Sequence, residues 1–145
     1  MSEELEQGSD AWRQARCGSL GASSLHEALA KTAKGAWGAS RANLLSRLVV
    51  ERLTGAPQDS FQSQAMKDGT AREPEARAAY QFEVATLVKT VGIIKHHTIP
   101  WSHCSPDGLI GDDGLIEIKC PTESTHLDTL LGASIPQKYV TQIMW

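Results

Sequence analysis

The sequence predicts an α/β (α+β) domain, a three-layer fold with a small mixed central sheet flanked by helices. The prediction depends on the order in which the periodicity changes along the chain. Apolar residues recur at helical spacing up to about residue 84, a β-rich stretch with turn signals covers residues 86–119, and helical patterns return after residue 121. Helices on both sides of a short run of strands are typical of a small sheet covered by helices.

The N-terminal part of the chain is predicted to hold a weak helix and a strong one. We expect a poorly ordered start over residues 1–11 and a short helix over Ser23–Ala33, capped by one of its first serines. After a loop of Lys, Thr and Gly, Ser40 is expected to cap an amphipathic helix with leucines at helical spacing. Gly55, just before Pro57, is a typical stop signal for that helix.

The helical stretch over residues 62–84 contains two residues that disfavour a helix interior. Gly69 costs backbone entropy, and Pro74 has no N–H to donate to the preceding turn. Because proline suits the first turn of a helix, we predict an interruption here and a new helix that begins near Glu73.

Short strands are predicted in the second half of the chain, at residues 86–96, 99–104, 108–110 and 115–119. The tripeptide Asp112-Asp113-Gly114 is a hairpin turn signal, so the last two strands are expected to pair antiparallel. A helical segment over residues 124–131 and a final helix from Pro136 complete the prediction.

Length and composition describe one globular domain over residues 1–145. The 41% apolar and 21% charged residues exclude collagen-like, disordered and coiled-coil classes. No apolar run approaches the roughly 18 residues that a membrane helix needs, so no membrane partner is expected. The N-terminus lacks a secretory signal, and the three cysteines include no C-x-x-C pair. We therefore expect a cytoplasmic protein with reduced thiols.

Charge is unevenly distributed along the chain, although the net charge is only −3. Residues 11–55 carry seven basic and two acidic residues, whereas residues 103–145 carry two basic and six acidic residues. An anionic ligand on the basic segment, beside metal-binding carboxylates on the acidic one, would explain this asymmetry. Chance variation over short windows would explain it equally well.

The densest polar cluster lies in the predicted hairpin. Glu117 and Lys119 are two residues apart on a strand, so both side chains leave the same face. The hairpin folds Asp107 back beside this strand, and the two carboxylates with the Ile118 backbone carbonyl form an oxygen site for a hard cation such as Mg²⁺. Lys119 at its edge is suited to hold an attacking water and to offset phosphate charge. The alternative is a buried Glu–Lys ion pair next to an incidental aspartate.

The same hairpin resembles the active site of a nuclease superfamily. Its segments SPDGL and IEIKCP have the Asp-x9-Glu-x-Lys spacing of PD-(D/E)XK nucleases, and more narrowly of the lambda exonuclease / YqaJ viral recombinase family. Other segments resemble three further motifs of that family, W-x3-R-x3-[IV]-[TG]-A-S, G-x3-E-P-x-A-R-x-x-Y and P-x2-Y-x2-Q, at residues 12–23, 69–80 and 136–142. Four motifs in the family order are a specific signal, whereas each alone is weak.

The resemblance implies a restriction-endonuclease-like core and a catalytic role for four residues. Glu73 matches an acidic residue that faces the metal ions from the preceding helix, often through water. Asp107 matches the carboxylate shared by two metal ions, Glu117 the second carboxylate ligand and Lys119 the catalytic lysine. The implied cofactor is a pair of Mg²⁺ ions, for which Mn²⁺ substitutes.

A second group of residues is implied to bind DNA. Arg16 matches the arginine that receives the terminal 5′-phosphate, and its planar fork is suited to two phosphate oxygens. Ser23 matches a second phosphate contact, at a predicted helix N-terminus that suits an anion. Gln142 matches the first glutamine of the last motif, but Met144 stands where many relatives carry a second one.

The resemblance implies a Mg²⁺-dependent 5′-to-3′ exonuclease on linear double-stranded DNA, in the cytoplasm of a bacterial or phage-infected cell. Hydrolysis by a metal-activated water would leave a 3′ single strand for phage-type recombination, with a single-strand annealing protein as partner. An endonuclease on the same core and a non-catalytic DNA-end-binding or recombinase-loading module are the alternatives. Relatives usually continue past the final helix and form trimers. We therefore expect a C-terminally truncated chain or a natural short form, which either associates with itself as a homo-oligomer through its C-terminal region or is less stable than a longer version.

Two competing assignments are weaker on spacing. Glu75 competes with Glu73 for the metal-facing position, but the two point about 200° apart on a helix and the motif register favours Glu73. A zinc site formed by His96, His97, His103 and Cys104 fits no standard ligand spacing.

Overall fold

The computed structural model describes residues 5–58, 62–132 and 134–145. Contacts divide the chain into two compact units, and each is described by itself. The first unit is made of Met1–Asp59, Val91–Ser105 and Pro136–Trp145, and the second of Ser60–Thr90 and Pro106–Ile135. That residues 1–145 act as one nuclease domain stays a prediction.

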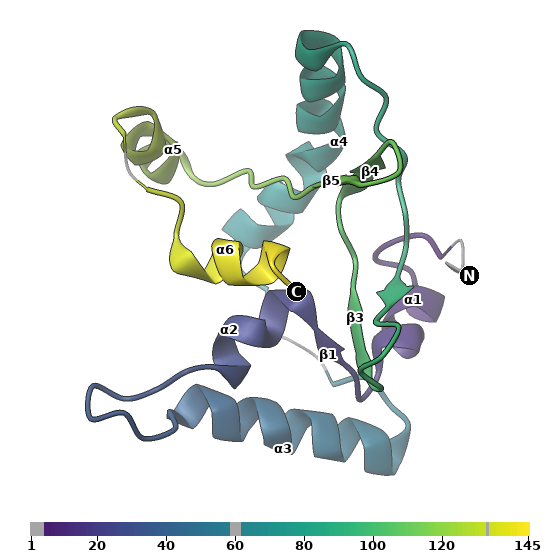
Figure 1. The fold of residues 1–145 in the computed structure, drawn as a ribbon, viewed down its shortest axis with the longest axis vertical. Helices are drawn as coiled ribbons and strands as arrows, with labels where there is room; N and C mark the ends of the chain where they lie inside the picture. The colour runs from purple at the N-terminus through teal and green to yellow at the C-terminus, as the bar shows by residue number, and fades with distance from the viewer. Residues whose placement is uncertain (1–4, 59–61, 133) are drawn as a thin grey trace. The chain divides into compact units, whose positions relative to one another are not determined.

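Helix α1 (Asp10–Arg16) opens the described part of the first unit (Figure 1). Its N-cap is Ser9, whose hydroxyl accepts a backbone N–H of the first turn. Gln7, just upstream, donates a hydrogen bond to the Val91 carbonyl. Contacts therefore hold the described start of the chain, residues 5–11, while the rest of the expected poorly ordered segment lies outside the described residues.

The short helix predicted after β1 (Leu20–Gly21) is reduced to a 3₁₀ turn and a single helical turn, η1 (Ala22–Ser24) and α2 (Leu25–Ala28). No side chain caps either turn, so the predicted serine cap is not formed. The Ser24 hydroxyl instead accepts a hydrogen bond from Arg47. A small β-bridged loop follows where the helix was expected to continue.

Helix α3 (Ala39–Thr54) is the amphipathic helix that the sequence predicts, but the predicted cap is wrong, because Gly38 is the N-cap and Ser40 lies inside the first turn. It ends, as predicted, at Gly55, which adopts a left-handed conformation with a φ of 67°. Glu51 is buried although it is charged, and its carboxylate accepts the backbone N–H of Gly18. This bond satisfies the buried carboxylate and ties α3 to the segment after α1.

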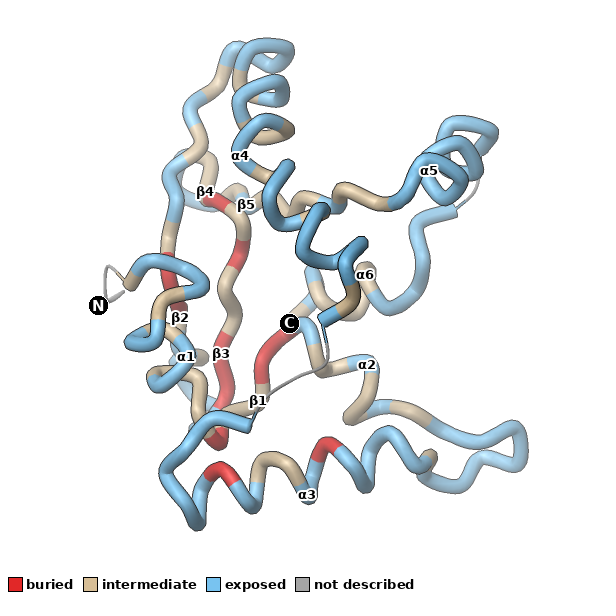
Figure 2. Tube along the Cα trace, turned by 180° about the vertical axis from the view of Figure 1, so that it is seen from behind, coloured by how far each residue is buried: buried red, intermediate tan, exposed pale blue. Residues whose placement is uncertain are grey.

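A three-stranded mixed sheet forms the centre of the first unit, in the order β1-β3-β2. β3 (Ser102–Cys104) pairs parallel with β1 and antiparallel with β2 (Ile94–Lys95). Ser102 and His103 of β3 are buried, and part of β3 is red in Figure 2. Helix α6 (Gln137–Ile143) packs against η1 and α2 in the same unit. The predicted fold class, a small mixed sheet flanked by helices, is confirmed, although the strands are shorter than predicted.

Helix α4 (Gln64–Val84) of the second unit runs without a break through Gly69 and Pro74, so the predicted interruption and new start near Glu73 are wrong. Pro74 removes only one hydrogen bond of the helix, the one to the Thr70 carbonyl. The surrounding residues are mostly strong helix formers such as Ala, Glu, Gln and Arg, and their hydrogen bonds carry the helix through that position.

A β-hairpin completes the ordered core of the second unit. β4 (Gly108–Ile110) and β5 (Gly114–Ile116) pair antiparallel around the predicted turn, and Leu109 bridges to Lys89. Helix α5 (Glu123–Leu130) follows, close to its predicted position.

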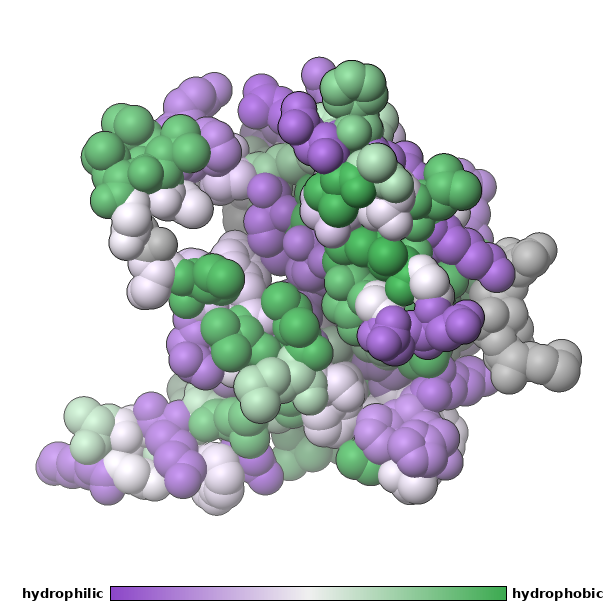
Figure 3. Space-filling view, turned by 45° about the horizontal axis from the view of Figure 1, so that its top comes forward, coloured by the Kyte–Doolittle hydropathy of each residue, from purple (hydrophilic) through white to green (hydrophobic). Residues whose placement is uncertain are grey.

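Large apolar side chains remain exposed in both units. Leu53 on α3 is 82% exposed, and Phe82 and Leu87 are 85% and 87% exposed. Figure 3 shows apolar side chains in green at several places on the face drawn, among polar ones in purple. None of the described helices combines the length and the apolar character that a membrane span requires.

Candidate active site

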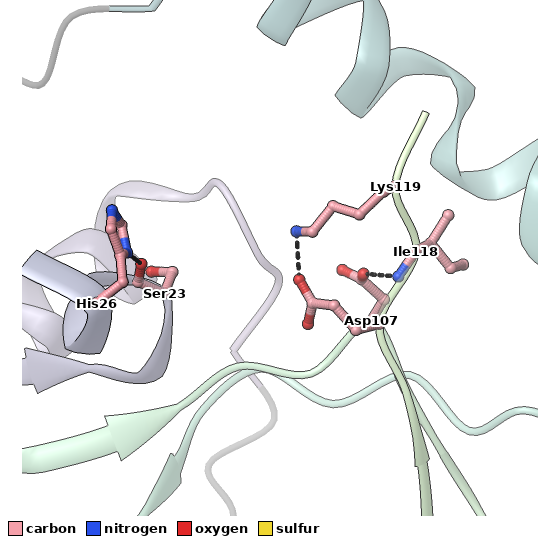
Figure 4. Close-up of polar contacts among 6 residues, drawn as sticks. Ser23, His26, Asp107, Ile118 and Lys119 are labelled. Atoms are coloured by element: carbon pink, nitrogen blue, oxygen red, sulfur yellow. Dashed lines mark hydrogen bonds and ion pairs between the residues drawn. The ribbon is translucent and has the colours of Figure 1, made fainter. Parts of the chain in front are cut away.

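The hairpin of the second unit places Asp107 beside the segment that carries Glu117. The Asp107 N–H donates to the Ile116 carbonyl. The Asp107 carboxylate oxygen Oδ2 accepts the N–H of Ile118 (Figure 4). The Asp107 side chain is thereby fixed across the strand, where the sequence predicts it. One carboxylate oxygen is used by this bond, which leaves the other for a ligand.

Glu117 and Lys119 lie just beyond the end of β5 and form an ion pair, in which Nζ donates to Oε1. The Glu117 side chain is only 9% exposed, whereas that of Lys119 is 39% exposed. β5 ends at Ile116, so the predicted strand over residues 115–119 stops before both residues, but the ion pair shows that the two side chains meet as their spacing predicts. The ammonium group therefore lies at the solvent side of a nearly buried carboxylate.

Glu73 on α4 joins this acidic group. Burial raises the pKa of the Glu73 carboxyl above its ordinary value, and the nearby carboxylates of Asp107 and Glu117 raise it further against the opposing effect of Lys119. Glu75, its competitor, has an exposed side chain. The Glu73 carboxyl is therefore close enough to the hairpin to respond to its charges.

Gly69 allows α4 to pass close to the segment that follows β5. A Cβ atom at Gly69 would lie 3.1 Å from the carbonyl oxygen of Cys120, tighter than most real contacts. Glu73 lies one helical turn after Gly69, on the same side of α4. The absence of a side chain at Gly69 therefore keeps the Lys119–Cys120 segment close to the turn that carries Glu73.

The donor set of this group suits a hard divalent cation. The carboxylates of Asp107 and Glu117 and the Ile118 carbonyl are oxygen ligands, which Mg²⁺ takes while keeping several waters. The raised pKa of Glu73 reflects its burial first and then the neighbouring carboxylates, whose negative charge a cation would offset. In the part of the chain that the structure describes, no three His, Cys, Asp or Glu side chains are arranged to hold a metal ion.

Arg16, at the last turn of α1 in the first unit, is held on two sides. Its guanidinium carbon lies 4.0 Å from the centre of the Trp12 ring, and its Nε donates to Nε2 of His103 at 3.0 Å. Trp12 is anchored in turn, because its Nε1 donates to the Gly92 carbonyl. Within the described ranges, no carboxylate forms an ion pair with Arg16.

The electrostatic surroundings of Arg16 favour an anion. Burial lowers the pKa of the Arg16 guanidinium, the neighbouring Arg47 lowers it further, and Glu51 acts in the opposite direction. Arg47 also donates to the Ser24 hydroxyl at 3.3 Å. Two guanidinium groups near the η1 turn therefore form a positive region, in which the sequence singled out only Arg16 as a specific contact.

Ser23 and Gln142 lie on neighbouring elements of the first unit. Ser23 is exposed in η1, and its carbonyl accepts a hydrogen bond from Nδ1 of His26 (Figure 4). Because η1 and α2 are single turns, they do not supply the helix dipole that the sequence predicts at Ser23. Gln142 is half-buried on α6, which packs against η1.

The structure gives His103 a role that the sequence does not predict, since its spacing suggests only a zinc site that fits no standard pattern. The residue is 2% exposed, and both ring nitrogens are hydrogen-bonded, Nε2 to Arg16 and Nδ1 to the Ser19 hydroxyl at 2.9 Å. No local pattern signals this role, because it depends on the parallel pairing of β1 with β3 across most of the chain.

Comparison with known proteins finds one family and solved relatives of the chain. The family described as YqaJ-like viral recombinase domain matches residues 11–145. A crystal structure of LHK-Exo in complex with dAMP is 41% identical with a TM-score of 0.84, and the match covers 93% of this chain and 65% of that one. A crystal structure of the alkaline exonuclease LHK-Exo from Laribacter hongkongensis is 40% identical with a TM-score of 0.83, and the match covers 92% and 64%. The chain thus spans about 65% of the length of these solved relatives. The search of curated proteins found no match.

Proposed function

The chain belongs to the family of YqaJ-like viral recombinase domains, and we propose that it is a Mg²⁺-dependent 5′-to-3′ exonuclease on linear double-stranded DNA. The observation that carries the proposal is the acidic group with an adjacent ammonium in the second unit, formed by Glu73, Asp107, Glu117 and Lys119. The similarity of the chain to an alkaline exonuclease also supports nuclease activity. Such a group combines oxygen ligands for a cation with a donor for phosphate oxygens.

The residues of this group have distinct roles in the proposed hydrolysis. Two Mg²⁺ ions, or Mn²⁺ in their place, held by Asp107, Glu117 and the Ile118 carbonyl, would supply an activated water and offset phosphodiester charge. Lys119 donates a hydrogen bond that orients the attacking water and stabilises charge on the phosphate oxygens. Glu73, with its raised pKa, accepts a hydrogen bond from a water and takes up a proton at a higher pH than an ordinary glutamate.

The first unit supplies the proposed contacts to the DNA end. Arg16 binds the terminal 5′-phosphate through its planar fork, since no carboxylate of the described residues competes for it. The Ser23 hydroxyl adds a second contact to that phosphate, and Gln142 a further contact to DNA. The relative LHK-Exo is known in complex with dAMP, a nucleotide with a 5′-phosphate, which supports recognition of this group.

Digestion of linear duplexes labelled at either end, with and without a 5′-phosphate, tests the proposal. We expect nucleotides to be released from the 5′ end, faster from phosphorylated ends, and only with Mg²⁺ or Mn²⁺ present. A circular duplex should resist. Cutting of the circle would favour an endonuclease on the same core, and metal-independent binding without release would favour a DNA-end-binding or recombinase-loading module.

The proposed product defines the wider setting. Digestion from 5′ ends leaves a 3′ single strand, which is the substrate of a single-strand annealing protein in recombination. We place this activity in the cytoplasm of a bacterial or phage-infected cell, with the chain acting as a homo-oligomer.

A further inference from the structure

The buried imidazole of His103 is hydrogen-bonded to Arg16, the proposed phosphate-binding arginine. His103 on β3 lies opposite Gly21 in the parallel β1–β3 pair, and the residue is 2% exposed. A Cβ atom at Gly21 would lie 3.1 Å from His103 Nε2 and 3.4 Å from Arg16 Nη2. The glycine therefore leaves room for the imidazole and the guanidinium to meet over β1.

The hydrogen bonds determine which ring nitrogen of His103 carries the proton. Arg16 Nε–H is always a donor, so Nε2 of His103, at 3.0 Å, must be the unprotonated acceptor. A neutral ring then carries its proton on Nδ1, which donates to the Ser19 hydroxyl at 2.9 Å. Burial and the Arg16 charge lower the pKa of His103 to about 4, so the ring is neutral near pH 7.

The same bonds fix which donors Arg16 keeps. A guanidinium has five N–H donors, and only the one on Nε is used by His103. In the described chain, no other hydrogen bond from the Arg16 guanidinium is present. The guanidinium carbon lies 4.0 Å from the centre of the Trp12 ring, so the ring limits the movement of the guanidinium on that side. The donors on the two Nη groups therefore remain available for a ligand, and their spacing matches that of two phosphate oxygens.

We propose that His103 positions Arg16 for the terminal phosphate, by accepting its Nε–H and so directing both Nη groups to the anion. The proposal rests on the phosphate-binding role of Arg16 in the proposed function. A neutral acceptor is suited to this task, because a carboxylate in its place would neutralise the guanidinium and compete with the phosphate. His103 is thus a positioning residue that preserves the positive charge of Arg16.

Two substitutions at His103 separate positioning from packing. The side-chain amide of His103→Gln can place its oxygen near the position of Nε2 and still accept from Arg16. The shorter His103→Asn can place its amide near Nδ1 and keep the bond to Ser19, but it has no acceptor within reach of Arg16. Both variants remove the ring, so the loss of packing is similar in the two and is checked by thermal unfolding.

The readout is the ratio of kcat/KM on 5′-phosphorylated and 5′-hydroxyl linear duplexes. We expect His103→Asn to lower this ratio about tenfold, as for a misplaced charge-assisted contact, while His103→Gln stays within about threefold of the wild-type protein. An unchanged ratio in His103→Asn, or an equal loss in both variants, would overturn the proposal.

A second measurement separates failure of this proposal from failure of the proposed function. In ¹⁵N NMR spectra, the Arg16 Nε–H should be protected from exchange in the wild-type protein and in His103→Gln, and exposed in His103→Asn. Arg16→Ala serves as the reference for the phosphate preference. If the wild-type protein and Arg16→Ala show the same preference, the role of Arg16 in the proposed function fails, and the NMR result alone then decides whether His103 positions Arg16.

Discussion

Asp107 combines a structural bond with the proposed metal ligation, and two substitutions separate these tasks. Asp107→Asn keeps an oxygen that can accept the Ile118 N–H, but it removes the charge that a cation requires. Asp107→Ala removes both. We expect both variants to lose nucleotide release by at least about a hundredfold. Only Asp107→Ala should also lose about 1–3 kcal/mol of unfolding free energy, because the Ile118 N–H is left without its partner.

Metal-dependent digestion and chemical denaturation measure the two effects on the same proteins. Asp112→Asn is the matched control, since it makes the same change of charge at the exposed hairpin turn. Substantial nuclease activity in Asp107→Asn would show that the reaction centre lies elsewhere.

Glu73 gives a prediction with a defined dependence on pH. A carboxyl whose pKa is raised on folding holds its proton more tightly in the folded chain. The stability that this proton contributes is fully present below the ordinary value of 4.5 and is lost as the pH rises through the raised folded value, above which the folded chain holds a carboxylate in an unfavourable place. Without metal, Glu73→Gln should therefore be more stable than the wild-type protein near neutral pH, with a difference that shrinks towards acidic pH.

The expected gain is no more than about 1 kcal/mol, because solvent screens the half-exposed side chain. Thermal unfolding from acidic to neutral pH, with and without Mg²⁺, measures it. Mg²⁺ should raise the midpoint of the wild-type protein more than that of Glu73→Gln, whose nuclease activity should fall. If Glu73→Gln is as stable as the wild-type protein at every pH, the charges of Asp107 and Glu117 do not act on Glu73.

At the scale of elements, the contact between α4 and the segment after β5 determines where Lys119 lies. Gly69→Val would push its side chain against the Cys120 carbonyl, 3.1 Å from the position of the Cβ atom. We expect a loss of about 1–3 kcal/mol in unfolding free energy and a larger relative loss of nuclease activity. Ala71→Val, exposed on the same helix, controls for the helix propensity of valine. Equal effects of the two substitutions would contradict a specific contact at Gly69.

The elements also show which parts of the molecule could be predicted from sequence. The β4–β5 hairpin follows from local signals, a turn tripeptide between short apolar strands, and it brings Asp107 and Glu117 together. The continuity of α4 through Pro74 could not be predicted, because the local cost of proline is outweighed by the rest of a long helix. The position of His103 depends on the pairing of β1 with β3, which no local pattern announces.

At the scale of the whole chain, exposed apolar residues predict self-association. Leu45, Val49 and Leu53 recur every four residues along α3, which places them on one side of the helix, and they are 62%, 45% and 82% exposed. Apolar stripes of this kind on folded proteins mark interaction surfaces, so we expect association that increases with concentration.

Sedimentation velocity over a concentration series measures this association. Glutamate at both Leu45 and Leu53 should shift the chain to monomer, whereas the control with glutamate at Asn43 and Ser46, exposed positions of the same helix, should associate like the wild-type chain. A wild-type chain that stays monomeric at all concentrations, or a control that dissociates as fully as the Leu45 and Leu53 variant, would show that this stripe does not drive assembly.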